Sequence, residues 1–156
     1  MEVYLVQHGE AKSEAEDPER PLTDKGRSEV ELTAGQISAA GIKVAEILHS
    51  GKLRARQTAE ILAGRLSPSP MIKEEKGLAP LADPQEAKNL IEQAEKPLMI
   101  VGHLPHLSKL ASLLISGSAE KEMVKFRMGG IVCLEKSEGN WLVKWALTPE
   151  LLQTNH

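Results

Sequence analysis

Short apolar runs alternate along the chain with segments of helical periodicity. Glu2 to Val6 and Val44 to His49 are short, apolar and rich in residues that favour strands. Pro97 to Val101 is a nearly continuous apolar run, which is typical of a central strand covered on both faces. Met71 to Lys73 is a candidate for a further short strand. The pattern therefore predicts strands separated by longer segments.

Four of the intervening segments predict helices. Thr23 can cap a helix that runs toward Gly41 with Val30, Ala34 and Ile37 on one face. Leu53 to Leu66 has helical spacing and ends at the turn-rich segment Ser67 to Pro70. A third helix is expected to start at Asp83, where Asp83, Pro84 and Glu86 form a capping box, and its buried face is Ala87, Leu90, Ile91 and Ala94. A fourth helix is expected to start at Pro105, with a buried face of Leu107, Leu110, Ala111 and Leu114.

After Gly117, the spacing of hydrophobic residues changes from a helical to a strand-like period. Ile131 to Leu134 and Trp141 to Leu147 alternate like strands, and Ser137 to Asn140 between them is a hairpin signal. Strands that alternate with helices favour a parallel sheet covered on both faces. The expected fold class is α/β: a three-layer α/β/α sandwich with a mainly parallel central sheet and an antiparallel C-terminal edge hairpin. We expect residues 1–156 to form a single domain.

Composition and charge exclude several classes of function. The 156 residues are 41% hydrophobic and 26% charged, with a net charge of -3, so no general affinity for nucleic acid is expected. No apolar run is long enough for a membrane span, and we expect a cytoplasmic monomer. The single cysteine, Cys133, lies in an apolar stretch and is interpreted as a small core residue.

Polar residues follow three of the predicted strands directly. These are His8, the pair His49-Ser50, and His103. Ligands in open parallel sheets bind outside the carboxyl ends of the strands, so these residues are expected at one edge. Arg54 lies at the start of a predicted helix, where free N–H groups favour an anion. The pattern predicts an anion site, whereas His49, His106 and His156 are interpreted as structural.

These motifs resemble those of the histidine phosphatase superfamily. Gln7-His8-Gly9-Glu10 resembles its Arg-His-Gly motif, Ser50 to Thr58 its second motif, and Gly102-His103 its third. Arg20 to Thr23 with Gly26, the short length, and the end at Thr148-Pro149 are similar to the SixA-type phosphohistidine phosphatases. The resemblance implies a phosphoglycerate mutase-like fold.

The resemblance also implies a mechanism without a metal or another cofactor. His8 would attack phosphorus through a neutral ring nitrogen and form a covalent phosphohistidine that water hydrolyses. Arg54, Arg20 and His103 as an imidazolium would stabilise the negative oxygens, together with Gln7, Gly9 and backbone N–H groups. The catalytic residues implied are therefore His8, Arg54 and His103.

Gln7 departs from the motif, which has an arginine at this position. The loss of one charge beside a phosphoryl dianion corresponds to about two to four kcal/mol, or ~100-fold to 1000-fold in rate. Arg20 and Lys12 are the candidates to compensate. The exchange leaves open a weakly active or inactive phosphate-binding pseudo-phosphatase.

The general acid is a second departure. Glu74 and Glu75 do not match the acid of larger superfamily members, and Glu10 is a further candidate acid near the nucleophile. A phosphohistidine substrate reduces the need for an acid, because its imidazole leaves more readily than an alkoxide. The chain has no insertion long enough to form a lid, so the site is expected to be open. The expected partner is a phosphorylated protein bearing phosphohistidine, and the alternative is a small phosphate ester.

Overall fold

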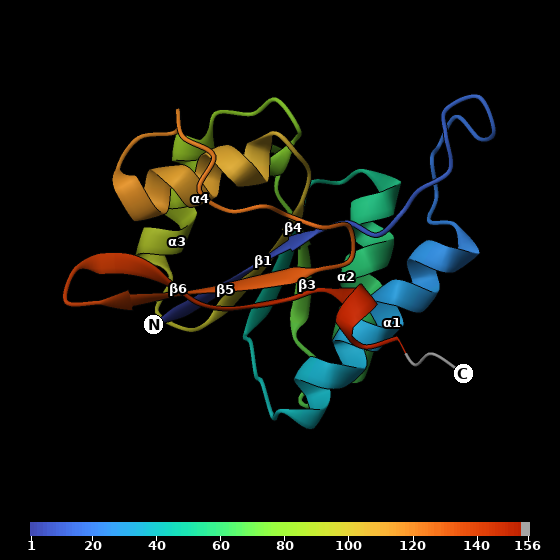
Figure 1. Ribbon diagram of the computed structural model, residues 1–156, viewed down its shortest axis with the longest axis horizontal. Helices are drawn as coiled ribbons and strands as arrows, with labels where there is room; N and C mark the ends of the chain where they lie inside the picture. Colours follow the sequence, from blue (N-terminus) through green and yellow to red (C-terminus); the bar gives the residue numbers. More distant parts are fainter. Residues whose placement is uncertain (154–156) are drawn as a thin grey trace.

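The computed structural model describes residues 1–153 and consists of a central sheet between two layers of helices (Figure 1). The strands are β1 (Glu2–Gln7), β2 (Glu46–His49), β3 (Met71–Glu74), β4 (Leu98–Gly102), β5 (Ile131–Ser137) and β6 (Asn140–Leu147). The α-helices are α1 (Asp24–Ala39), α2 (Leu53–Arg65), α3 (Pro84–Gln93) and α4 (His106–Ser116), and two 3-10 helices span Lys76–Leu78 and Pro149–Leu151. None of the helices in this part of the chain is long and apolar enough to cross a membrane.

The sheet has six strands in the order β3-β2-β4-β1-β5-β6. The first four are mutually parallel, whereas β5 runs antiparallel to β1 and pairs with β6 as a hairpin. This arrangement confirms the expected three-layer α/β fold with an antiparallel edge. Because β2, β4 and β1 are parallel neighbours, their carboxyl ends lie side by side at one edge of the sheet.

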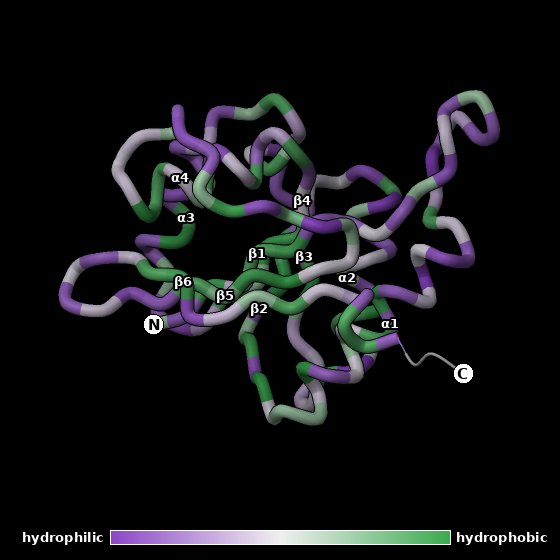
Figure 2. Tube along the Cα trace, in the orientation of Figure 1, coloured by the Kyte–Doolittle hydropathy of each residue, from purple (hydrophilic) through white to green (hydrophobic). Residues whose placement is uncertain are grey.

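Side chains alternate between the two faces of the sheet, as the period of a strand requires. Tyr4 and Val6 of β1 pack toward α1 and α2, whereas Val3 and Leu5 pack toward α3 and α4. All five residues of β4 are buried, which confirms a central strand covered on both faces. Figure 2 shows this hydrophobic interior along the middle strands, enclosed by more hydrophilic loops.

The N-terminal cap predicted for α1 is present, whereas the cap predicted for α3 is present only in part. The Thr23 hydroxyl accepts a hydrogen bond from the Gly26 N–H at 2.9 Å and begins α1 as predicted. Asp83 caps α3, but its carboxylate accepts from the Gln85 N–H at 3.0 Å. The predicted capping box was wrong in its second half, because the only bond between Glu86 and Asp83 runs from the Glu86 N–H to the Asp83 carbonyl.

The loop between β1 and α1 carries the acidic stretch Glu14 to Glu19. It projects from the body of the molecule (Figure 1), and most of its side chains are exposed. The base of the loop is fixed by pairing between Ala11 and Leu22 and by the hydrogen bond from the Leu22 N–H to Gln57 Oε1 at 2.8 Å. The residues after the acidic stretch are thereby held against α2.

Candidate active site

Three strand ends bring His8, Ser50 and His103 together. His8 follows β1, Ser50 follows β2 and His103 follows β4, and the His8 N–H donates to the Gly102 carbonyl at 3.1 Å. The His8 and His103 ring centroids are 5.0 Å apart with an interplanar angle of 51°. The sheet topology therefore assembles the pair of rings that the sequence placed at two separate strand ends.

The His8 ring is oriented by its own neighbour. Its Nδ1 lies 2.7 Å from the Gly9 carbonyl oxygen, so Nδ1 carries the proton and donates it. Nε2 is then left with its lone pair. Burial lowers the pKa of His8 to about 4, against the hydrogen bond to Gly9, and the charges of Arg54 and Arg20 lower it further. His8 is consequently a neutral imidazole at neutral pH.

His103 is bound to Ser50 and is also neutral in the free site. Its Nε2 lies 2.6 Å from Ser50 Oγ, and this oxygen also accepts a hydrogen bond from the Lys52 N–H. Burial lowers the pKa of His103 to about 3, and the neighbouring His8 and Arg54 act in the same direction. The unliganded site therefore favours the neutral ring, because His103 is buried beside cationic groups.

Arg54 lies in the first turn of α2, next to the two rings. The Thr58 hydroxyl accepts from the Gly9 N–H at 3.0 Å and donates to the Arg54 carbonyl at 2.8 Å. This pair of bonds ties α2 to the segment after β1. Burial lowers the pKa of Arg54, and so does the nearby charge of Arg20.

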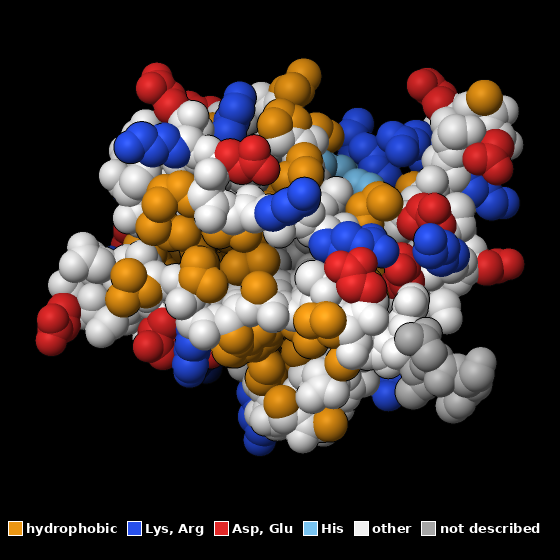
Figure 3. Space-filling view, in the orientation of Figure 1, with side chains coloured by type: hydrophobic (Ala, Val, Ile, Leu, Met, Phe, Trp, Pro, Cys, Tyr) orange, Lys and Arg blue, Asp and Glu red, His pale blue; other side chains and the backbone are white. Residues whose placement is uncertain are grey.

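Arg20 faces the same region from the loop before α1. Its backbone is in the left-handed region (φ 52°), and its Nε donates to the Lys12 carbonyl at 3.1 Å. Within residues 1–153, neither Arg20 nor Arg54 forms an ion pair with a carboxylate. Figure 3 shows histidine side chains at the surface beside a group of Lys and Arg side chains. The arrangement suits a ligand with more than one negative charge.

Two of the predicted phosphate-binding residues are placed differently. The Gly9 N–H donates to the Thr58 hydroxyl, and the Gly9 carbonyl accepts from His8. An added Cβ at Gly9 would meet Val30 Cγ2 at 2.8 Å, so a side chain at this position would collide with α1. The Gln7 side chain lines a separate hollow, which Glu10 also lines.

The histidines interpreted as structural lie apart from this chemistry or outside the described residues. The Gly51 N–H donates to His49 Nδ1 at 3.0 Å, and His106 is fully buried at the start of α4. His156 lies outside residues 1–153. These placements agree with structural roles for His49 and His106.

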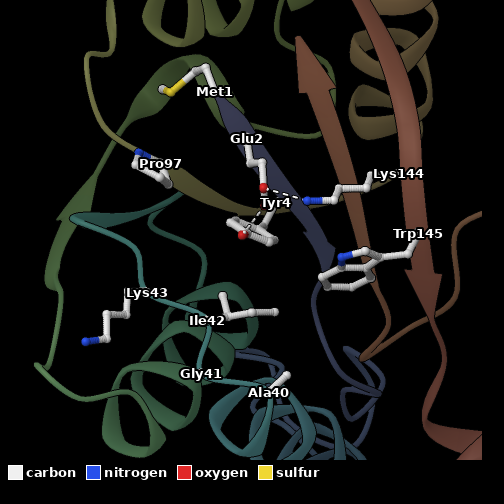
Figure 4. Close-up of a pocket in the computed structure, with 10 residues that line it drawn as sticks. All are labelled: Met1, Glu2, Tyr4, Ala40, Gly41, Ile42, Lys43, Pro97, Lys144 and Trp145. Atoms are coloured by element: carbon white, nitrogen blue, oxygen red, sulfur yellow. Dashed lines mark hydrogen bonds and ion pairs between the residues drawn. The ribbon is translucent and has the colours of Figure 1, made fainter. Parts of the chain in front are cut away.

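Another hollow, of about 510 Å³, lies at the amino ends of β1 and β4 (Figure 4). The Glu2 carboxylate at its wall already accepts bonds from the Tyr4 hydroxyl at 2.6 Å and from Lys144 at 2.9 Å. Its lining contains no histidine or arginine. The hollow therefore lacks the histidine and arginine side chains found at the carboxyl ends of the parallel strands.

The sequence interpretation missed Lys52 and Thr58 as contributors to the site, and it placed Ser50 at this edge without its contact to His103. Ser50 contacts His103, Lys52 lowers the pKa of His103, and Thr58 joins Gly9 to α2. The role of Thr58 could have been predicted from the sequence, because a hydroxyl on the buried face of a helix needs a hydrogen-bond partner. The position of Ser50 directly after a strand was a weaker signal of the same kind.

Comparisons with known proteins agree with the geometry. A model of the histidine phosphatase superfamily (branch 1) matches residues 3–79. An uncharacterized protein of Picosynechococcus sp. is 37% identical over 142 residues, covering 86% of this chain and 84% of that protein. Phosphohistidine phosphatase SixA of Escherichia coli is 26% identical over 154 residues, covering 96% of this chain and 94% of SixA.

Comparison of the fold with solved structures also identifies a SixA protein as a relative. The structure of protein histidine phosphatase SixA complexed with tungstate superimposes with a TM-score of 0.86 at 26% identity, covering 98% of this chain and 100% of that one. Sequence and fold thus agree over nearly the whole chain. The protein belongs to the histidine phosphatase superfamily, is of the SixA type, and is a phosphatase.

Proposed function

We propose that this phosphatase removes the phosphoryl group from protein phosphohistidine through a covalent intermediate on His8. The observation that carries the proposal is the His8 ring itself. Its Nδ1 is engaged with the Gly9 carbonyl at 2.7 Å and its pKa is lowered to about 4, so Nε2 offers a lone pair at neutral pH. A neutral imidazole in a fixed orientation is what a nucleophile requires.

The first step transfers the phosphoryl group from one imidazole to another. His8 Nε2 forms a bond to phosphorus while the bond to the substrate nitrogen breaks, and the electron pair of that bond stays on the substrate ring. In the second step, water forms a bond to phosphorus, the electron pair of the P–N bond returns to His8 Nε2, and the proton that water loses passes to the phosphate product or to solvent. Inorganic phosphate is released.

The charges around the ring support this role. Arg54 and Arg20 have no carboxylate partner within residues 1–153, and both lower the pKa of His8 through their positive charge. Guanidinium groups match phosphoryl oxygens through two donors at once. Phosphoryl transfer depends mainly on such charge stabilisation and on positioning.

The ligand also affects His103. A bound phosphoryl group brings two negative charges next to a ring whose pKa is lowered to about 3 in the free site. Opposite charge nearby favours the protonated form, so substrate binding raises the pKa of His103. We propose that His103 becomes the expected imidazolium only when the oxyanion is bound.

The substrate class is supported by similarity to SixA. The relative named phosphohistidine phosphatase aligns over 94% of its own length, and the SixA structure holds tungstate, an oxyanion. The acidic loop Glu14 to Glu19 projects from the body of the molecule, and most of its side chains are exposed (Figure 1). Access by a histidine on another protein is therefore favoured over enclosure of a small ester.

Trapping the intermediate tests the nucleophile. The protein is mixed with a phosphohistidine peptide, quenched in alkali, in which phosphohistidine is stable, and analysed by mass spectrometry of its peptides. We expect a phosphoryl group on the peptide that contains His8, and neither label nor turnover in His8→Asn. Turnover by His8→Asn at the rate of the unmodified protein would overturn the assignment.

Substrate profiling tests the substrate class. The values of kcat/KM for a phosphohistidine peptide and for sugar phosphates are compared, with Arg27→Ala as a control in which an exposed charge is removed from α1. A higher value for the peptide supports the proposal. Preference for a sugar phosphate would make the protein a small-molecule phosphatase, and binding of the peptide with neither labelling of His8 nor turnover would make it a pseudo-phosphatase.

A further inference from the structure

A hollow of about 320 Å³ is lined by residues that neighbour the two histidines in the chain. Gln7, which precedes His8, and Leu104, which follows His103, both line it. Its apolar wall is completed by Phe126 and Met128 from the segment before β5. We call this hollow the Gln7 pocket. Neither ring lines it, but its walls are formed by the chain neighbours of both histidines, which makes it a candidate for the part of a substrate that carries the phosphoryl group.

Two oxygen acceptors at the polar wall of the Gln7 pocket have no hydrogen-bond donor in the described structure. Glu29 is 2% exposed; its Oε2 accepts from Arg127 at 3.0 Å, but its Oε1 has no partner in the described structure. The Oε1 of Gln7 also lacks a partner there. Buried acceptors without donors are costly, and their presence beside a hollow favours a ligand that brings N–H groups.

Glu10 is the acceptor best placed for such a ligand. It lines the pocket two residues after His8 and is only partly buried. Its Oε2 accepts from the Thr23 hydroxyl at 2.7 Å, which fixes the carboxylate at the start of α1. No bond to its other oxygen occurs within residues 1–153, so Oε1 is available to a ligand.

We infer that the Gln7 pocket receives the imidazole of the substrate phosphohistidine, and that Glu10 accepts a hydrogen bond from the ring nitrogen that does not carry phosphorus. Leu104 and Phe126 provide apolar contacts for the faces of the ring. This inference rests on the proposed function, because it concerns the leaving group of the same reaction. It makes Glu10 a positioning and specificity residue rather than a proton donor to the bridging atom.

The proposed bond determines the form in which the imidazole leaves. When the distal ring nitrogen is protonated, the P–N bond breaks with its electron pair passing to the ring, and neutral imidazole departs. Without that proton, the ring would have to leave as an anion. A carboxylate close to the ring raises the pKa of the distal nitrogen and extends the reactive form to higher pH.

Other charged groups face the same pocket. Lys25 and Glu29 face it from α1, and Arg127 faces it from the segment before β5. The Arg127 charge is met by Glu29 and by Glu150, each at 3.0 Å. These two carboxylates outweigh the single Arg127 charge, so Lys25 and Glu10 act at the ring in addition to an excess negative charge, with Glu10 as the acceptor.

The test compares Glu10→Gln with Glu14→Gln, which removes the same charge from the exposed loop. Glutamine can keep the bond from Thr23 through its amide oxygen, so α1 retains its start. The single-turnover rate of phosphoryl transfer is measured from pH 5.5 to 8.5 with a phosphohistidine peptide. The kcat/KM ratio of this peptide to p-nitrophenyl phosphate, whose leaving group has no ring nitrogen, is measured in parallel.

We expect Glu10→Gln to move the high-pH decline of the peptide reaction about one pH unit lower and to reduce the substrate ratio about 10-fold. Glu14→Gln should retain the ratio and the profile of the unmodified protein. Equal losses on both substrates, or a profile that does not move, would overturn the role of Glu10. If the unmodified protein does not hydrolyse the phosphohistidine peptide, the proposed function itself fails, which is a different result.

Discussion

Ser50 Oγ lies 2.6 Å from His103 Nε2, although the two residues are 53 positions apart in the chain. The contact exists because β2 and β4 are parallel neighbours and each residue directly follows its strand. Ser50 is itself held by the Lys52 N–H at the start of α2. The ring of His103 is thus fixed by the same helix start that carries Arg54.

Replacing Ser50 with alanine should therefore reduce catalysis without removing a group that touches the substrate. The His103 ring would lose its fixed orientation, and a loss of positioning of this kind corresponds to about a 10-fold fall in kcat. Kinetics with a phosphohistidine peptide check this, with Ser13→Ala in the exposed loop as the control. A change confined to KM would contradict a role in orienting His103.

The lowered pKa of His8 predicts that the free energy of unfolding decreases as pH falls. The folded pKa of about 4 lies below the ordinary value of 6.5, so the unfolded chain binds more protons between these pH values. The stabilising contribution is present above pH 6.5 and is lost as pH falls toward 4. Between pH 7 and pH 5 the loss from this group is about 2 kcal/mol.

Urea unfolding of the protein and of His8→Asn at the two pH values measures this difference. The variant should lose about 2 kcal/mol less of its free energy of unfolding between pH 7 and pH 5. His103 contributes in the same direction in both proteins, and the difference also includes the part of its lowered pKa that His8 causes. Equal losses in the two proteins would show that His8 is not responsible.

Gln7→Arg should raise activity, because it returns a positive charge to the position directly before His8. The gain expected is about 10-fold in kcat/KM, less than the full effect of a charge-stabilising contact, because Arg54 and Arg20 already act on His8 through their charges. Gln7→Met serves as the control, since it removes the amide without adding charge. No gain in the arginine variant would show that the missing charge does not limit the rate.

Arg20 is predicted to carry part of the charge that Gln7 lacks. Its guanidinium acts on the pKa of both His8 and Arg54, whereas Lys12 binds Arg20 only through its backbone carbonyl in the described structure. Arg20→Gln should lower kcat/KM by about 100-fold. The control is Arg27→Gln, which removes the same charge from the exposed side of α1. It should change kcat/KM by less than about twofold.

Gly26 is expected to be required for stability rather than for chemistry. A Cβ at this position would collide with the Glu10 backbone, so Gly26→Ala should destabilise the protein by about 1–3 kcal/mol. Gly64 in α2 has nothing within 4 Å of an added Cβ. Gly64→Ala should instead stabilise by about 0.5–1 kcal/mol, as helix propensity predicts, and thermal unfolding distinguishes the two.

Local pattern was sufficient for most of the fold. The burial of β4 on both faces, the Thr23 cap and the C-terminal hairpin follow from apolar runs, a capping hydroxyl and turn residues. The hairpin turn has positive φ at both Glu138 and Gly139, a geometry that matches the twist of paired strands. The second half of the α3 capping box depended on a side-chain orientation that the residue pattern alone did not determine.

The sequence by itself determined which residues end the strands and which begin the helices, because those boundaries depend on nearest neighbours in the chain. It therefore identified His8, His103 and Arg54 as candidates. Only the tertiary structure decided that Ser50 holds His103, that the Gly9 N–H is used by Thr58, and that both rings are neutral in the free site. These properties depend on burial and on groups distant in sequence, so they exist only after the strands have been ordered into a sheet.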